Sequence, residues 1–403
     1  MAASCQLTTS PLPHIGPMLF LNPDFELPSL GTAIEELRQN VRQFLAEEID
    51  QSHFKPMCNS WTDGFSPEFS KRLGDRGWIG RHWPAQYGGR DGSALETLTI
   101  NEELLAAGAP VAAHWIGARQ SAPLLMRFGS EAQRKEFLPR IAAGRLFFAI
   151  GMSEPDVGSD LASVRTRADQ QGSAWIIRGR KVWTSGAHLS DYAIVLCRTA
   201  PMDPQARHAG LSQMIVDLRT KGVSIRPIRM LDGSHHFNEV VFDDVEVPVD
   251  RVVGLPGDGW KQVTSELAYE RSGPERFLST MPLLERFVQR AVSGPASAGD
   301  IAAGRLLARL MGLRNMSLGV WGALGAGQSP VIEAAMVKDL GTNFERESLE
   351  IVREAMVSDE RLAGDDEMAD LLKAAVPLAP TYTLRGGTTE VLRNMIAKDL
   401  QRR

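Results

Sequence analysis

Apolar residues recur every three or four positions in the first part of the chain, between about residues 32 and 145. This spacing places them on one face of an α-helix, so it predicts amphipathic helices packed as a bundle. Thr32 and Glu35 have the spacing of a capping box and predict the start of the first helix. The apolar face of that helix is expected to comprise Ile34, Leu37, Val41, Phe44 and Leu45, and further helices are expected at 95–106 and 131–141.

The pattern changes between residues 147 and 253, where short runs rich in β-branched residues alternate with turn signals. Such runs are typical of β-strands, and their spacing predicts an antiparallel sandwich or barrel of about 100 residues. The strands are expected at 174–179, 192–197, 211–216 and 239–242.

Helical spacing returns after residue 259 and continues to the C-terminus, with helices expected at 260–269, 283–291, 301–318 and 331–356. Helices, then strands, then helices indicate separate layers rather than an alternating α/β sheet. We therefore expect a multidomain α and β protein. Its parts would be an N-terminal arm at 1–30, an all-α domain at 31–148, a β domain at 149–253 and a C-terminal helical bundle at 254–403.

Composition narrows the function classes. A net charge of −5 lacks the basic surplus of a nucleic-acid-binding protein, so no nucleic-acid partner is expected. The three cysteines are widely spaced, which argues against a disulfide framework or a zinc site and favours a reducing compartment. The N-terminus does not resemble a signal peptide, and no apolar run reaches the ~18 residues of a membrane span, so the cytoplasm is the expected location.

Several common catalytic motifs are absent from the sequence. No GxGxxG follows a predicted strand, and there is no P-loop, HExxH or GxSxG. His235 and His236 lie between a turn signal and an expected strand, and neighbouring side chains in a strand face opposite ways, so we expect no metal site there.

Two segments of the β region stand out: IGMSEPDVGSD at 150–160 and KVWTSG at 181–186. They resemble the two flavin-binding signatures of the acyl-CoA dehydrogenase family. Further matches in the expected order strengthen the resemblance, which covers about residues 35–400. These are GW at 77–78 with YGG at 87–89, GSEAQR at 129–134, FNEVVFDDVEVP at 237–248, GDGW at 257–260 and RGGTTEVLR at 385–393.

This resemblance implies an FAD-dependent enzyme that converts an acyl-CoA to the trans-2-enoyl-CoA and passes electrons to an electron-transferring flavoprotein. A flavin needs hydrogen-bond donors at its polar edge and an apolar wall at the other end, which these segments supply. Each segment alone is also compatible with a tight turn and a core tryptophan. The resemblance assigns cofactor contacts to Ile150, Met152, Ser153, Gly158, Ser159, Trp183, Thr184, Ser185, Thr388 and Glu390, with Ser159 also at the entry of the acyl-CoA.

The resemblance also indicates the catalytic base. Many family members carry it at the position of Gly386, which has no side chain. A smaller set, resembling the long-chain and isovaleryl-type enzymes, places a glutamate before an arginine on the first long C-terminal helix. Glu270 and Arg271 match that pattern, so Glu270 is the expected base, with Arg271 near the substrate and the Gly386 N–H on the thioester oxygen. A solvated helix pair is the alternative, and Glu266 and Glu275 are the rival carboxylates.

Two family features are missing. The Arg-x-x-Phe-Gly segment that reaches a neighbouring subunit's FAD is not found at 293–305, and the Leu-Gly-Gly-x-Gly turn is not found at 353–360. The partner is therefore expected to be either a second copy, in a homodimer or homotetramer, or a paralogue in a heterotetramer. Arg385 is expected to place a positive charge near the thioester or the CoA. A flavin oxidase or monooxygenase, and a non-catalytic subunit of a heteromeric dehydrogenase, remain alternative functions.

Overall fold

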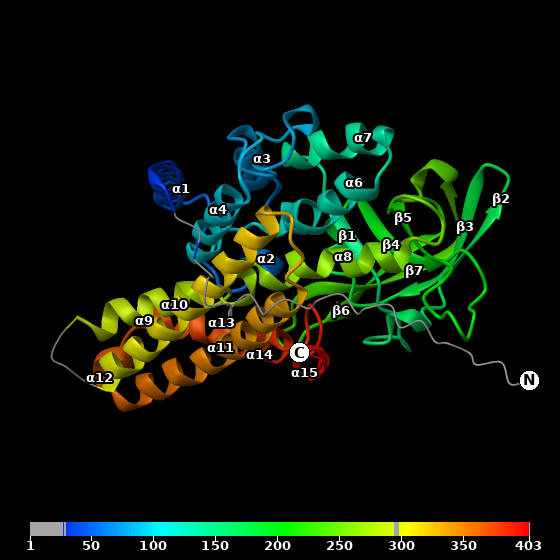
Figure 1. The fold of residues 1–403 in the computed structure, drawn as a ribbon. Helices are drawn as coiled ribbons and strands as arrows, with labels where there is room; N and C mark the ends of the chain where they lie inside the picture. The colour runs from blue at the N-terminus through cyan, green and yellow to red at the C-terminus, as the bar shows by residue number, and fades with distance from the viewer. Residues whose placement is uncertain (1–26, 28–29, 294–297, 403) are drawn as a thin grey trace, which may run out of the picture.

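The computed structural model describes residues 27, 30–293 and 298–402, without the side chains of residues 266–270. Most of the predicted arm, residues 1–30, lies outside the described residues. The predicted order of helices, strands and helices is confirmed, and the sheet lies to one side of the two helical regions (Figure 1).

The N-terminal helices differ in how they begin. The predicted capping box of α1 is wrong, because Thr32 is its first residue and Gly31 caps it without a side-chain bond. Capping boxes do start α4 and α7, where Ser93 and Ser130 accept bonds from N–H groups three residues later. The helices are α1 (Thr32–Asp50), α2 (Ser60–Asp63), α3 (Pro67–Asp75), α4 (Ala94–Ala106), α5 (Ala112–Ile116), α6 (Ala122–Phe128) and α7 (Glu131–Ala142), with a π-helical turn at Gly117–Ser121.

The middle region is one seven-stranded sheet in the order β1-β4-β2-β3-β7-β6, with β5 paired to β4. Most pairs are antiparallel as predicted, but β1 and β2 both run parallel to β4. The long β7 pairs with β3 and β6, and its first residues belong to the candidate site described below. The strands are β1 (Phe148–Gly151), β2 (Arg167–Gln171), β3 (Ala174–Lys181), β4 (Tyr192–Arg198), β5 (Leu211–Asp217), β6 (Val223–Arg229) and β7 (His235–Pro248).

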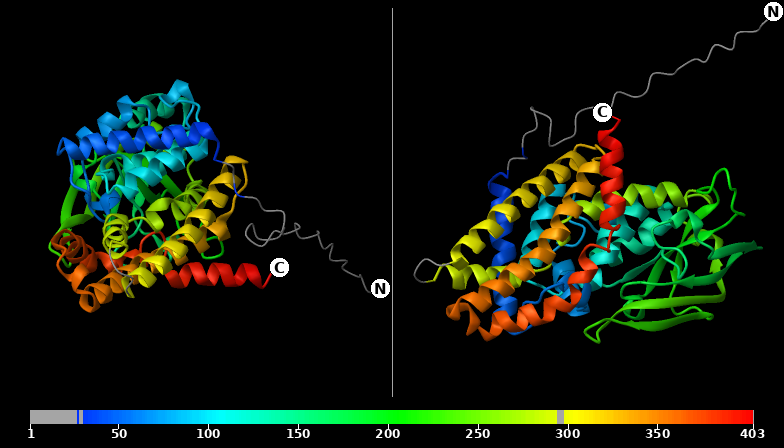
Figure 2. Two further views of the ribbon diagram at one scale, coloured as in Figure 1. Left: turned by 90° about the vertical axis from the view of Figure 1, so that its left-hand side faces the viewer. Right: turned by 90° about the horizontal axis from the view of Figure 1, so that it is seen from below.

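The C-terminal region is built on two 28-residue helices, α10 and α11, which lie side by side. The last helix, α15, packs on α11 and stands away from the body of the bundle in both views of Figure 2. The helices are α8 (Gly259–Ser272), α9 (Met281–Ala291), α10 (Ala298–Gly325), α11 (Val331–Ser358), α12 (Glu360–Ala363), α13 (Asp366–Ala375), α14 (Ala379–Tyr382) and α15 (Thr389–Leu400).

The two helical regions share one hydrophobic core, in which Trp115 of the first packs in a continuous cluster with Phe277 and Phe344 of the second. The sheet has its own core around Ile177 and Val195. Apolar burial of this kind is the main stabilising term in folding. The helical core and the sheet meet at α8, the first helix after the β region. The predicted site segments come from the β region on one side of α8 and from the C-terminal helices on the other.

Candidate functional site

The first predicted flavin segment begins on β1 and leaves it as a tight turn. Ile150 and Gly151 end the strand, and Met152 packs in a small apolar cluster with Val263 of α8. The carbonyl of Ser153 accepts a hydrogen bond from the N–H of Val182 at 2.9 Å. The first and second flavin segments are therefore held against each other by backbone contact.

A buried ion pair fixes this turn from below. Lys181, which is fully buried, donates from Nζ to the Met152 carbonyl and to Glu154 Oε1, both at 2.9 Å. Glu154 also accepts from the N–H groups of Arg165 and Thr166 at 2.7 and 2.9 Å. Burial alone raises the pKa of Glu154, but the Lys181 charge and these donors outweigh it and hold the pKa below its usual range.

The second flavin segment presents an open aromatic face. The Trp183 side chain is 57% exposed, and its ring lies perpendicular to that of Phe237, with ring centroids 5.7 Å apart. Its φ of +58° lies in the left-handed region, which a bulky residue adopts only when its surroundings enforce it. Ser185 is half-buried beside it, whereas the Thr184 side chain is buried.

Asn238 of β7 provides that enforcement. Its carbonyl accepts from the Thr184 N–H and its Nδ2 donates to the Thr184 carbonyl, both at 3.0 Å. The Oδ1 of Asn238 lies 2.7 Å from Nε2 of His235, so the amide is itself held in place. Fully satisfied buried networks rigidify the backbone they contact, and here that backbone carries Trp183 and Ser185.

Gly158 and Ser159 lie in the exposed turn that follows the first segment. The next residue, Asp160, pairs with Arg207 at 2.6 Å on the surface. The turn that carries Ser159 is therefore exposed to solvent.

The predicted thioester segment is a loop between α14 and α15. Gly386 and Gly387 have φ values of +69° and +98°, which glycine adopts without steric cost. Buried cations hold the loop's carbonyls: Arg271 Nε donates to Gly386 at 3.3 Å, and Lys338 Nζ donates to Thr383 and Gly387 at 3.2 and 2.7 Å.

The same loop leaves donors unused. Among the hydrogen bonds of the described residues, none involves the N–H of Gly386 or Gly387. Arg271 is 4% exposed and Lys338 is fully buried, so both cations act from inside the protein. Backbone N–H groups without a protein partner are the kind of donor that can stabilise developing negative charge.

Lys338 was not anticipated from the sequence. Burial, followed by the charges of Arg276, Arg385 and Arg271, lowers its pKa to about 7. A lysine in the apolar stretch of a helix was the available signal, since buried lysines are rare unless paired. Glu154, Lys181 and Asn238 were missed for a similar reason, because their partners lie far along the chain.

Arg385, which is expected near the thioester or the CoA, directly precedes Gly386 in the thioester loop. Its guanidinium turns into the protein, where Nη2 donates to Glu345 Oε2 at 3.0 Å and to Ser279 Oγ at 2.9 Å. It also lies over the rings of Trp61 and Tyr382, at 4.5 and 4.8 Å from their centroids. Because its charge is paired with Glu345, Arg385 links distant segments of the chain.

Glu270 and Arg271 lie in the last turn of α8, where Arg271 contacts the thioester loop. The Glu270 and Glu266 side chains lie outside the described residues. The third candidate, Glu275, is 2% exposed, and its Oε1 pairs with Arg119 at 2.8 Å.

Thr388 and Glu390 lie at the start of α15. Thr388 caps the helix by accepting from the Val391 N–H, and Glu390 is exposed. No hydrogen bond of the described residues joins either one to the two flavin segments.

A cavity of about 120 Å³ lies between the second flavin segment and the N-terminal helices. Ser185 lines one side of it and Trp61 and Ile116 line another. Because Trp61 also stacks on Arg385, this cavity connects the flavin segment with the residue that precedes Gly386.

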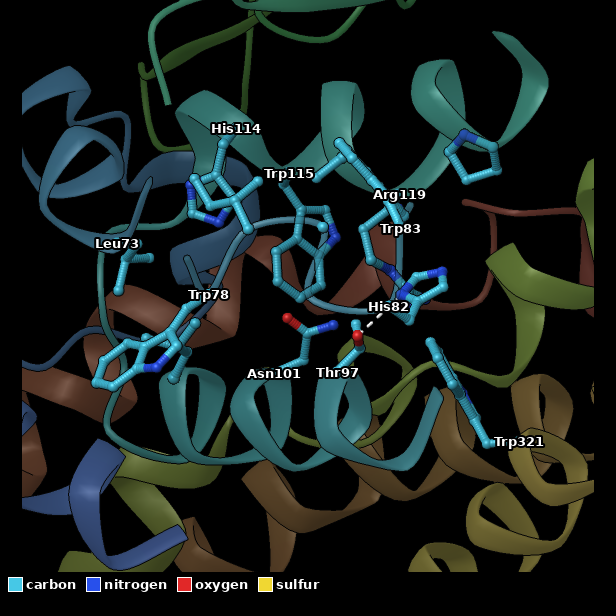
Figure 3. Close-up of a pocket in the computed structure, with 15 residues that line it drawn as sticks. Leu73, Trp78, His82, Trp83, Thr97, Asn101, His114, Trp115, Arg119 and Trp321 are labelled. Carbon is cyan, nitrogen blue, oxygen red and sulfur yellow. Dashed lines mark hydrogen bonds between the residues drawn. The ribbon is translucent and has the colours of Figure 1, made fainter. Parts of the chain in front are cut away.

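A second cavity, of about 30 Å³, lies inside the N-terminal helices (Figure 3). His82 bonds to Thr97 at its edge, and burial lowers the pKa of His82 to about 4, so the ring is neutral. Arg119 lies between Trp115 and Trp321, at 5.5 and 5.2 Å from the ring centroids. A space of this size holds about one water, so it is not a substrate site.

No helix within the described ranges is long and apolar enough to cross a bilayer.

Comparison with known proteins assigns residues 32–145 to the acyl-CoA dehydrogenase N-terminal domain and residues 149–245 to the acyl-CoA dehydrogenase middle domain.

The chain is 34% identical to the acyl-CoA dehydrogenase IpdE1 of Mycobacterium tuberculosis, covering 91% of this chain and 96% of that protein. Its structure matches the Tcur3481-Tcur3483 steroid ACAD with a TM-score of 0.80 and 29% identity, over 92% of this chain and 97% of that one. It matches the ChsE4-ChsE5 complex from Mycobacterium tuberculosis with a TM-score of 0.76 and 29% identity, over 91% and 97%. The chain therefore belongs to the acyl-CoA dehydrogenase family, whose members are FAD-dependent oxidoreductases acting on CH–CH bonds.

Proposed function

We propose that Glu270 removes the α-proton of an acyl-CoA while the Gly386 N–H stabilises the thioester oxygen. The α-proton of a thioester is weakly acidic, so its removal needs both a carboxylate base and a stabilised oxyanion. Bound FAD supplies the acceptor for the hydride that leaves the β-carbon, and the product is the trans-2-enoyl-CoA.

One observation carries this proposal. The Gly386 loop has carbonyls bound by Arg271 and Lys338, and the N–H groups of Gly386 and Gly387 form no hydrogen bond with the described residues. Arg271 directly follows Glu270 on α8. A base at the end of that helix would thus lie on the element that holds the oxyanion donor. Preorganised donors of this kind lower a barrier because they need no rearrangement during the reaction.

The residues of the β region fit a flavin. Trp183 offers an exposed indole face, and the adjoining turn offers backbone groups and the half-buried hydroxyls of Ser153 and Ser185. We propose that Ile150, Met152 and the Trp183–Thr184 backbone hold the ring, and that Gly158, Thr388 and Glu390 contact the rest of the cofactor. Ser159 and Arg271 would then line the path of the acyl-CoA.

We further propose a partner chain. The missing Arg-x-x-Phe-Gly and Leu-Gly-Gly-x-Gly segments leave the far end of the FAD without its usual contacts. Similar structures are named as pairs of different chains, one of them a steroid ACAD. A heterotetramer with a paralogue, acting in the cytoplasm on a bulky acyl group and donating electrons to an electron-transferring flavoprotein, accounts for both facts.

The test is anaerobic flavin bleaching by a panel of acyl-CoAs, using protein purified alone and with a co-expressed paralogue. Wild type should bleach, whereas Glu270→Gln should retain FAD but reduce it about 10²–10⁴-fold more slowly, the usual contribution of a general base. Glu266→Gln, four residues away on the same helix, is the matched control and should bleach normally.

Other outcomes identify the alternatives. A flavin-loaded complex that never bleaches would make this chain a non-catalytic subunit. Rapid reoxidation by air with formation of peroxide would make it an oxidase. Normal bleaching by Glu270→Gln together with failure of Glu266→Gln would assign the base to Glu266, one helical turn earlier on α8.

A further inference from the structure

The cavity beside Ser185 is lined by both aromatic and polar side chains. Trp61, Phe65 and Phe148 form the walls. Asp63, Ser234 and His236 line the same space. Ligand sites typically combine such apolar walls with a few convergent polar groups that select one orientation.

Two of these polar side chains, Asp63 and Ser234, can form further hydrogen bonds. Among the described residues, Asp63 forms no ion pair, and the Ser234 hydroxyl oxygen is buried with no hydrogen-bond partner. Burial raises the pKa of Asp63 to about 6, although a bond from Thr62 and the Arg385 charge oppose the rise. At neutral pH the carboxylate is therefore largely ionised and accepts hydrogen bonds only.

The position of the cavity relates it to the reaction. Ser185 belongs to the flavin segment, and Trp61 stacks under Arg385, the residue before Gly386. A group bound in this space is thus close to both the hydride acceptor's segment and the thioester loop. The acyl chain beyond the reacting carbons is the part of the substrate that would occupy it.

Its size limits what fits. A cavity of about 120 Å³ compares with the ~150 Å³ protein cavity that binds benzene, so it holds about one six-membered ring. A simple hydrocarbon ring would satisfy the aromatic walls but leave Asp63 desolvated with Thr62 as its side-chain donor and further acceptor capacity unmet, which is costly. A ring ketone would not help, because a carbonyl accepts and cannot donate to a carboxylate.

We propose that this cavity binds a hydroxylated carbocycle in the acyl group of the substrate, with the hydroxyl donating to Asp63. This inference rests on the proposed dehydrogenase function and specifies its substrate class. Asp63 is thus a specificity-determining residue, and Ser234 and His236 supply further polar groups in the same cavity.

The test compares three matched thioesters: 3-cyclohexylpropanoyl-CoA and its ring-hydroxylated and ring-keto counterparts. The flavin-loaded protein, with its paralogue if one co-purifies, is assayed for kcat/KM by anaerobic flavin reduction. Wild type should prefer the hydroxylated substrate over the hydrocarbon by about tenfold to a hundredfold, the usual value of a hydrogen bond to a charged group. Asp63→Asn should reduce this preference and Asp63→Leu should abolish or reverse it.

Asp232→Asn is the matched control. Asp232 contributes a nearby negative charge but does not line the cavity, and its side-chain oxygen bonds to the Ser234 N–H, which asparagine can preserve. It should keep the wild-type preference.

Two results would overturn the proposal. One is an equal or greater preference of wild type for the hydrocarbon or the ketone. The other is a flavin-loaded Asp63→Leu protein that keeps the wild-type substrate ratio, and weaker FAD retention by that variant would assign the cavity to the cofactor. If none of the three thioesters, nor any other acyl-CoA, bleaches the wild-type flavin, it is the dehydrogenase function itself that fails.

Discussion

Two buried ion pairs support the two halves of the candidate site, and they differ in how completely they are satisfied. Glu154 receives Lys181 and two backbone N–H groups, and its pKa is lowered. Glu345 receives Arg385 and Ser279 but is fully buried on α11, and burial prevails, so its pKa is raised. The protein therefore favours the ionised form of Glu154, whereas burial disfavours the ionised form of Glu345.

The difference follows from where the partners come from. Glu154 and Lys181 lie on neighbouring parts of one sheet, so the backbone that positions them also supplies donors. Arg385 instead joins α2, α11 and the thioester loop, segments that meet only when the helical regions pack together. The flavin half of the site is thus a local structure and the thioester half is an assembled one.

The largest effect is expected from Lys181→Met, which leaves Glu154 as a buried anion without its cation. Breaking such a pair costs about 3–5 kcal/mol. Urea unfolding at neutral pH should show this loss, accompanied by weaker FAD retention. The double variant Lys181→Met, Glu154→Gln should recover most of the stability, and its failure to do so would mean that the lysine acts through packing alone.

Arg385→Met should cost less, about 3 kcal/mol, at the lower end of the same range. The reason is that Glu345, whose pKa is already raised, can take up a proton and lose its charge. A double-mutant cycle with Glu345→Gln measures the coupling. A larger loss than that of Lys181→Met would contradict the comparison.

Lys338→Met should slow flavin reduction about tenfold, as expected for the loss of roughly one hydrogen bond that orients the loop. It should also change a pH dependence. Folded Lys338 releases its proton near pH 7 but the unfolded chain does so near 10.5, so raising the pH across this interval favours folding. Urea unfolding at pH 7 and pH 9 should show this rise in wild type and a smaller one in the variant.

The smallest expected effect is on the pH dependence of the unfolding free energy, to which Glu154 and Glu345 should contribute with opposite signs. A lowered pKa makes Glu154 stabilise the fold above pH 4.5, with the contribution lost as the pH falls further. A raised pKa makes the Glu345 contribution greatest below pH 4.5, with loss as the pH rises through its folded value. Glu154→Gln should therefore alter the pH dependence of the unfolding free energy below pH 4.5 and Glu345→Gln above it, with opposite signs. Trends of the same sign would refute the assignment.

The same contrast explains what could be predicted from the sequence. The contiguous flavin segments and the strand pattern around them were found because each is a single run of residues. The parallel pairing of β1 with β4 was missed, since nothing local encodes which strands become neighbours. The wrong capping box at Thr32 shows that spacing alone does not determine where a helix starts.

The assembled half could not be predicted in this way. Lys338 lies 45 residues from one of its loop partners and 49 from the other, and Arg385 lies 326 residues from Asn59. The pairing of Arg385 with the buried Glu345 could not be predicted, because nothing in the sequence brings these two residues together. Asp63 carried no motif at all and became a candidate only once the cavity was seen.

The exposed ring of Trp183 has an optical consequence. Of the eight tryptophans, Trp83, Trp115, Trp175 and Trp321 are buried, whereas Trp183 is 57% exposed on a backbone held by Asn238. Light absorbed by an indole in water is re-emitted at longer wavelengths than from a buried one, and a flavin stacked on it would take up that energy. The fluorescence of Trp183 should therefore fall when FAD binds, and its intensity would report the fraction of the protein that holds the cofactor.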